Sequence, residues 1–89
     1  MDLPESLLRQ YISHRIEDLE ILQTMRDSNN FDRCAAIGHR LKGSGPAYGF
    51  KELGVIGIAI QAAADDRSAE KISSQLELLA QWIEAHHFD

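Results

Sequence analysis

The sequence predicts an all-α protein, an antiparallel up-and-down four-helix bundle. Four segments repeat apolar residues at spacings of three and four, and short polar turns separate them. The one strand-like apolar run, residues 55–60, continues through Gln61 into three alanines, which favour helix, and no other segment offers it a partner strand. With 89 residues, 44% of them hydrophobic, the chain suffices for one small core. We therefore predict a single domain over residues 1–89.

The first helix is predicted over residues 3–28. Pro4 suits a first helical turn, and Asp2 before it is a candidate cap. The periodicity leaves open a break near Tyr11. Turn-forming residues 27–30 end the helix. The apolar residues of its buried face are Leu8, Ile12, Ile16, Leu19 and Leu22.

The second helix is predicted to begin near Phe31, with Asn30 as its cap. Gly38 and Gly45 would allow a neighbouring helix to pack closely. Pro46 lacks an amide hydrogen and crowds the preceding turn, so the helix should kink or end about there. The side chains expected to face the core are Phe31, Cys34, Leu41 and Tyr48.

Gly49 is a natural terminator, and a third helix is predicted over about 50–66. Residues 65–67 form the next turn, and Ser68 can cap the fourth helix. Trp82, beside Ile83, is better explained as core than as part of a ligand site. The apolar stripe of the fourth helix comprises Ile72, Leu76, Leu79 and Ile83.

Charge and cysteine content restrict the class of protein. The net charge of -5 argues against nucleic acid as a partner, because binding the phosphate backbone needs a basic surface. Residues 33–51 nevertheless carry four basic side chains and no acid, so they form a basic island. The single cysteine, Cys34, excludes an internal disulfide and fits a reduced intracellular setting. No apolar run approaches membrane-spanning length and no signal peptide is evident, so we expect a soluble, cytoplasmic monomer.

The candidate site is His39, which lies among unusually small residues. On a helix, Ala35 and Ala36 lie one turn before it, and Lys42 and Gly43 one turn after it. Glycine costs a helix about 0.5–1 kcal/mol relative to alanine, so its presence at position 43 indicates that space is needed there. We expect something large to reach the His39 ring.

The run His39-x-Leu41-Lys42-Gly43-Ser44, followed by small residues and by Gly49-Phe50, resembles the histidine phosphotransfer (HPt) domains of bacterial two-component phosphorelays. The resemblance implies that His39 accepts a phosphoryl group. A neutral imidazole has a lone pair for attack, and an ordinary histidine is largely neutral at cytoplasmic pH. Lys42 would offset phosphoryl charge, Ser44 or a nearby backbone amide would donate a hydrogen bond, and Gln61 on the following helix would orient the ring.

A protein of this kind is a phosphorelay carrier without autonomous catalysis, and so not an enzyme. The resemblance implies that a response-regulator receiver domain is its partner, with a hybrid sensor histidine kinase as a further one. It implies no cofactor or metal of its own, since magnesium would belong to the receiver. A complete set of four helices after Met1 fits a free-standing module.

Three other functions are weighed against this one. The first is a helical adaptor or pseudo-phosphotransfer domain that binds a receiver or kinase without passing phosphate. A metal-binding bundle ranks well below it, because His86 and His87 are adjacent on a helix and point apart, and solvated or capping roles suit them better. The Lys-Gly-Ser-Gly run has the wrong order for a nucleotide-binding loop and follows no strand.

Overall fold

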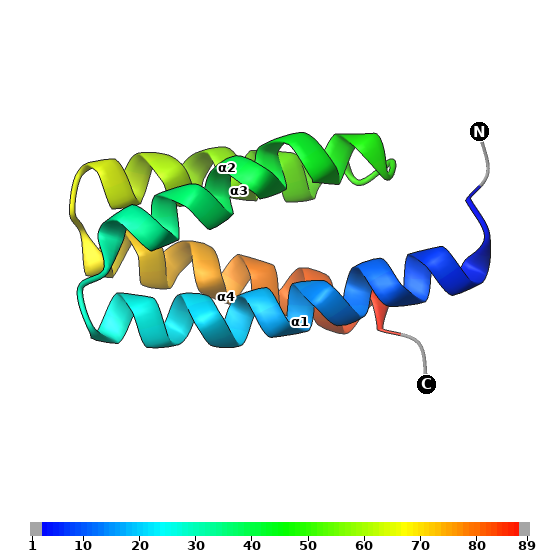
Figure 1. Ribbon diagram of the computed structural model, residues 1–89, viewed down its shortest axis with the longest axis horizontal. Helices are drawn as coiled ribbons and strands as arrows, with labels where there is room; N and C mark the ends of the chain where they lie inside the picture. Colours follow the sequence, from blue (N-terminus) through cyan, green and yellow to red (C-terminus); the bar gives the residue numbers. More distant parts are fainter. Residues whose placement is uncertain (1–2, 88–89) are drawn as a thin grey trace.

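The chain folds as an all-α antiparallel four-helix bundle, which confirms the predicted fold class. The computed structural model describes residues 3–87. Within them lie four helices, α1 (Glu5–Asp27), α2 (Phe31–Ala47), α3 (Lys51–Asp65) and α4 (Ala69–His86). Successive helices run in opposite directions, and α2 and α3 form one layer over α1 and α4 (Figure 1). Each helix contacts two neighbours, and α1 does not contact α3 over the described part of the chain.

The helix boundaries agree with the predictions to within one or two residues. The Asn30 side chain accepts a hydrogen bond from the Arg33 amide, 3.2 Å away, and Ser68 accepts one from the Lys71 amide, 3.1 Å away. Both predicted caps are thus confirmed. Pro4 immediately precedes α1 rather than lying in its first turn, and α1 continues without a break through Tyr11. The candidate cap Asp2 lies outside the described residues.

The end of α2 resolves the alternative left open at Pro46. The helix includes Pro46 and ends one residue later, at Ala47, so it ends about where the proline predicts an end. Gly49 follows with a φ of +87°, a left-handed conformation that glycine adopts without strain. The predicted terminator is therefore confirmed.

The core contains part of the apolar stripes that the periodicity predicts, with one aromatic addition. The predicted core-facing residues that are only half-buried are Leu8, Ile16, Leu19, Phe31 and Tyr48. Cys34, Leu41 and the whole α4 stripe are buried. Tyr11 is buried as well, although it was not predicted to be, because its ring stacks on Tyr48 with 4.1 Å between ring centroids. The core side chains with almost no exposed surface are Leu22, Cys34, Leu41, Leu53, Ile60, Ile72 and Leu79.

Glycines hold α2 and α3 unusually close. A Cβ added at Gly57 would lie 2.6 Å from the Lys42 amide nitrogen and 2.7 Å from the Gly38 carbonyl oxygen. A Cβ at Gly45 would lie 2.7 Å from the amide nitrogen of Gly54. The predicted close-packing roles of Gly38 and Gly45 are confirmed, and the facing glycines belong to α3. This crossing fixes α3 against the helix that carries His39.

No helix among the described residues is long and apolar enough to cross a membrane.

Candidate functional site

His39 projects from the middle of α2 into solvent. Its side chain is exposed, and the structure gives the ring no hydrogen bond or ion pair to any other residue in 3–87. The backbone beneath it is held rigidly, because Gly38 on one side is buried against α3 and Leu41 on the other is buried in the core. An unpartnered imidazole on a rigid helix is accessible to a second molecule from outside.

The surface beside His39 is open at Gly43. A Cβ built at Gly43 meets no atom within 4 Å, whereas Cβ atoms at Gly38, Gly45 and Gly57 would all collide with backbone. Packing within this chain therefore explains those glycines but does not explain Gly43. An exposed mid-helix glycine weakens a helix relative to alanine, and no contact within the described chain requires one at this position.

The two basic residues nearest His39 in sequence differ in their partners. An Arg40 guanidinium nitrogen lies 3.4 Å from an Asp18 carboxylate oxygen on α1. The other Asp18 oxygen lies 2.9 Å from Arg15 Nε, and this carboxylate is almost fully buried. Lys42 is exposed and has no ion pair within the described chain. Lys42 is therefore the cation beside His39 that is available to an incoming anion.

The structure does not bring Ser44 to His39. The Ser44 hydroxyl lies 2.8 Å from the Tyr11 hydroxyl of α1, and the two share a partly buried hydrogen bond. Five residues along an α-helix correspond to a rotation of about 140°, so Ser44 faces the bundle while His39 faces solvent. The hydroxyl expected beside the phosphoryl group instead joins α2 to α1.

Gln61 lies near His39 but does not hydrogen-bond its ring. Its backbone nitrogen is 2.8 Å from the Cβ position of Gly38, the residue before His39. The side chain is half-buried. No hydrogen bond joins the Gln61 amide to the imidazole in the structure as described. The fold thus places Gln61 of α3 beside the turn of α2 that carries His39, and the role of Gln61 in orienting the ring stays a prediction.

The outer face of α3 carries apolar side chains that the sequence analysis did not single out. Val55 is 66% exposed and Ile58 is 51% exposed. The uninterrupted run of residues 55–60 was the signal in the sequence, and it was interpreted only as a core feature.

The other histidines do not form a metal site. Among the residues described, no group of three histidine, cysteine or acidic side chains is placed to hold a metal ion. His86 stacks on Trp82, and its Nδ1 lies 2.8 Å from the Trp82 carbonyl oxygen, to which the ring N–H donates. This bond fits the capping alternative for His86, whereas His87 was predicted on the helix and instead lies beyond the end of α4, in an extended conformation.

Comparisons of this chain with models of protein families, with curated proteins and with solved structures found no match. The residues around His39 are therefore the basis for assigning a function to this chain.

Proposed function

We propose that this protein is a phosphoryl carrier that receives a phosphoryl group on His39 from an aspartyl phosphate of a receiver domain. The carrier then passes the group to an aspartate of another receiver. The observation that carries the proposal is the exposed, unpartnered His39 ring beside an open Gly43 and an unpaired Lys42. The resemblance of residues 37–50 to HPt domains supports the same function.

The transfer is a displacement at phosphorus. The lone pair of an unprotonated ring nitrogen of His39 attacks phosphorus, and an N–P bond forms. The P–O bond to the donor aspartate breaks, and its electron pair stays on the leaving carboxylate. The positive charge that the ring gains is relieved when its other nitrogen releases its proton to water, which the exposed ring contacts directly. Attack by an acceptor carboxylate reverses each change.

For this transfer the carrier needs mainly to position the imidazole and to place positive charge near the phosphoryl oxygens. Lys42, one helical turn from His39 and exposed, would offset the charge of the phosphoryl oxygens. Ser44 contributes indirectly, because its bond to Tyr11 holds the turn after His39 against α1. The remaining catalytic groups, magnesium included, belong to the receiver in this proposal.

Intact-mass spectrometry tests the proposal. The protein is mixed with a receiver domain phosphorylated on its aspartate, and His39→Gln and His14→Gln are compared with the wild type. His14 is a matched control, because it is an exposed histidine on α1. We expect one acid-labile phosphoryl group on the wild type and on His14→Gln, and none on His39→Gln.

A phosphoryl group retained by His39→Gln would refute the role of His39. If several active receivers left no phosphoryl group on the wild type while one of them still bound it, the helical adaptor would replace the carrier. That alternative is favoured by one observation, which is that no described side chain hydrogen-bonds and orients the His39 ring.

Bulk at position 43 tests whether a receiver must approach this surface. Gly43→Arg places a long side chain one turn from His39, so we expect phosphoryl transfer to be lost while the helical circular dichroism is kept. Gly43→Ala is the matched control, because its methyl group meets nothing within 4 Å in this chain, and we expect it to reduce transfer far less than Gly43→Arg. Unchanged transfer rates in Gly43→Arg would show that a receiver does not approach His39 across position 43.

A further inference from the structure

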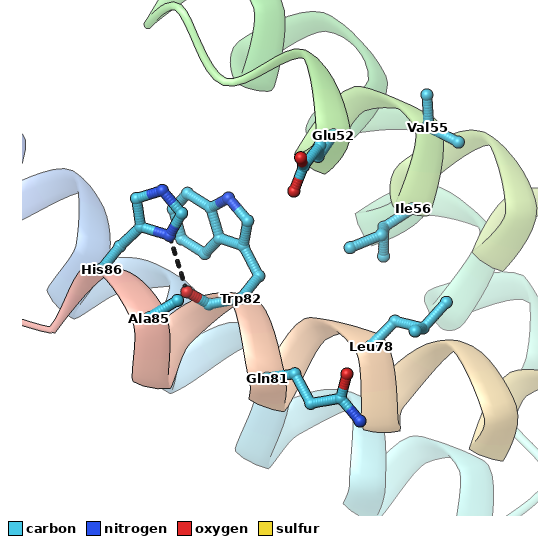
Figure 2. A pocket seen from close by; sticks show the side chains of 8 residues that line it. All are labelled: Glu52, Val55, Ile56, Leu78, Gln81, Trp82, Ala85 and His86. Carbon is cyan, nitrogen blue, oxygen red and sulfur yellow. Dashed lines mark hydrogen bonds between the residues drawn. The ribbon is translucent and has the colours of Figure 1, made fainter.

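An apolar groove runs between α3 and α4, on a surface that the proposed phosphoryl transfer does not use. At one end it forms an open hollow of about 400 Å³. Figure 2 shows Ile56 of α3 and Leu78 of α4 extending toward each other across it, with Trp82 and His86 at one end. Val55 lies on its α3 rim, and both Val55 and Leu78 are exposed large hydrophobic residues.

A separate depression lies farther along the same two helices. This second hollow, of about 320 Å³, is lined by alanines of α3 and by polar residues of α4. The two hollows together extend from Glu52 to Asp66 on α3. At 1.5 Å per residue this is roughly 21 Å, the length of a helix of about four turns. The lining of the second hollow comprises Ala59, Ala62, Ala63, Asp66, Lys71, Ser74 and Gln75.

The rims of this groove are acidic. On α4, three exposed glutamates recur every seven residues, which places them on one face of the helix. Two of them border the groove, because Glu70 lies one turn before the lining residue Ser74 and Glu77 lies one turn before Gln81, whereas Glu84 lines a hollow on the α1 side of α4. None of the three has an ion pair within residues 3–87. The acids that border the groove are Glu52, Asp66, Glu70 and Glu77.

Two lysines lie near these rims against four acids, and one of them, the exposed Lys51, lies beside Glu52 at the Trp82 end of the groove. Lys71 lies in the groove, but its Nζ is 3.1 Å from an Asp66 carboxylate oxygen, so this pair is already formed. The His39 surface has the opposite charge, with Lys42 exposed and unpaired there. The molecule thus presents a basic face on α2 and an acidic apolar groove between α3 and α4.

We propose that the α3–α4 groove binds an amphipathic helix of a partner protein, with the apolar face of that helix on the groove and lysine or arginine side chains along its edges. Apolar anchors at helical spacing would contact Ile56, Leu78 and Trp82, and the flanking cations would face the glutamates. Complementary charge of this kind steers association and fixes orientation. The proposal does not depend on phosphoryl transfer at His39.

A second copy of this chain is a poorer occupant. A two-fold interface brings the same surface of each subunit together, so two copies of the groove would meet acidic rim against acidic rim. Like charges placed together in an interface are unfavourable. The charge of the rims therefore favours a basic partner over self-association.

The test uses the whole protein and a fluorescein-labelled helical peptide as the probe. The peptide carries leucines at spacings of three and four on one face and lysines elsewhere, and a second peptide carries glutamates in place of the lysines. Affinity is measured by fluorescence anisotropy for the wild type and for Glu70→Lys/Glu77→Lys. The matched control is Glu17→Lys/Glu20→Lys, which makes the same charge change on exposed positions of α1, a helix that does not contact α3 in the described structure.

We expect the lysine peptide to bind the wild type and the glutamate peptide not to bind. The groove variant should weaken binding at least about tenfold, which corresponds to ~1.4 kcal/mol, while the α1 control changes it less than about twofold. Amide and indole chemical shifts should change mainly along α3 and α4, and Leu78→Gln, which alters no charge, should weaken binding as well.

Four outcomes would overturn the proposal. Equal losses in the two charge variants would show diffuse attraction to an acidic protein. Shifts centred on α2 would place the peptide at the His39 surface. Failure of the lysine peptide to bind would remove the helix as occupant, and self-association of the protein through Leu78 in sedimentation experiments would assign the groove to a second copy.

Discussion

Adding one methyl group to Gly43 and to Gly57 should change stability in opposite directions. Both glycines are helical, so alanine favours the helix at either position by about 0.5–1 kcal/mol. At Gly43 nothing within 4 Å opposes this gain. We therefore expect Gly43→Ala to raise the free energy of unfolding by about 0.5–1 kcal/mol, and the melting temperature by about 2–8 °C.

At Gly57 the same methyl group meets backbone. Its Cβ would lie 2.6 Å from the Lys42 amide nitrogen, and ordinary contact begins at 3.4 Å, so the difference of 3.4 − 2.6 = 0.8 Å must come from separation of α2 and α3. A gap of about 0.5–1 Å forfeits a quarter to a half of the dispersion energy of each contact across it. Overpacking of this kind costs about 1–3 kcal/mol, and the upper end applies here because backbone atoms cannot rotate away.

Urea unfolding, followed by circular dichroism at neutral pH, measures both variants against the wild type. The net expectation for Gly57→Ala is a loss of about 2 kcal/mol after the helix gain is included. A destabilised Gly43→Ala would show that position 43 is constrained by this chain itself, and the docking explanation of that glycine would fail. A Gly57→Ala variant as stable as the wild type would show that the helices do not cross as closely as described.

Two further predictions concern the core. Tyr11→Phe removes the 2.8 Å hydrogen bond to Ser44 and should lower the free energy of unfolding by about 1 kcal/mol, as should Ser44→Ala. The double variant should lose less than the sum of the two single losses, because both substitutions remove the same bond. Strictly additive losses would mean that the bond contributes nothing to stability. Burial raises the pKa of the Cys34 thiol above its ordinary value of 9.0, and the Arg26 charge opposes this more weakly. The stability contributed by the neutral thiol is therefore fully present below the unfolded pKa and is lost as pH rises toward the folded pKa. Unfolding free energies measured between about pH 8 and pH 10 should decline more steeply for the wild type than for Cys34→Ala, and equal slopes would contradict this linkage.

Local signals in the sequence predicted the helices and their ends well. Asn30 and Ser68 cap α2 and α4 as expected, because a cap acts on amides only two or three residues away. Gly49 takes a left-handed conformation for an equally local reason. The exposure of His39 was also predictable, because the side chains one turn away on its face are small or flexible.

Long-range partners were not predictable. Asp18 looks like one more acid on an acidic helix, yet it is buried between Arg15 and Arg40, and only the packing of α1 against α2 reveals the arginine from the second helix. Ser44 belongs to the motif, but its hydroxyl bonds to Tyr11, 33 residues earlier in the chain. A single sequence does not encode such pairs as a local pattern.

The sequence by itself determined the four helices, the side-chain caps of α2 and α4, and the small-residue surroundings of His39, because spacing, capping and side-chain size act over one or two helical turns. Only the tertiary structure decided what each helix faces. It matched Gly38 and Gly45 on α2 with glycines on α3, turned Ser44 away from His39, and left an acidic apolar groove between α3 and α4. These outcomes depend on how helices distant in sequence are rotated against one another, and that rotation is chosen by the packing of the whole core.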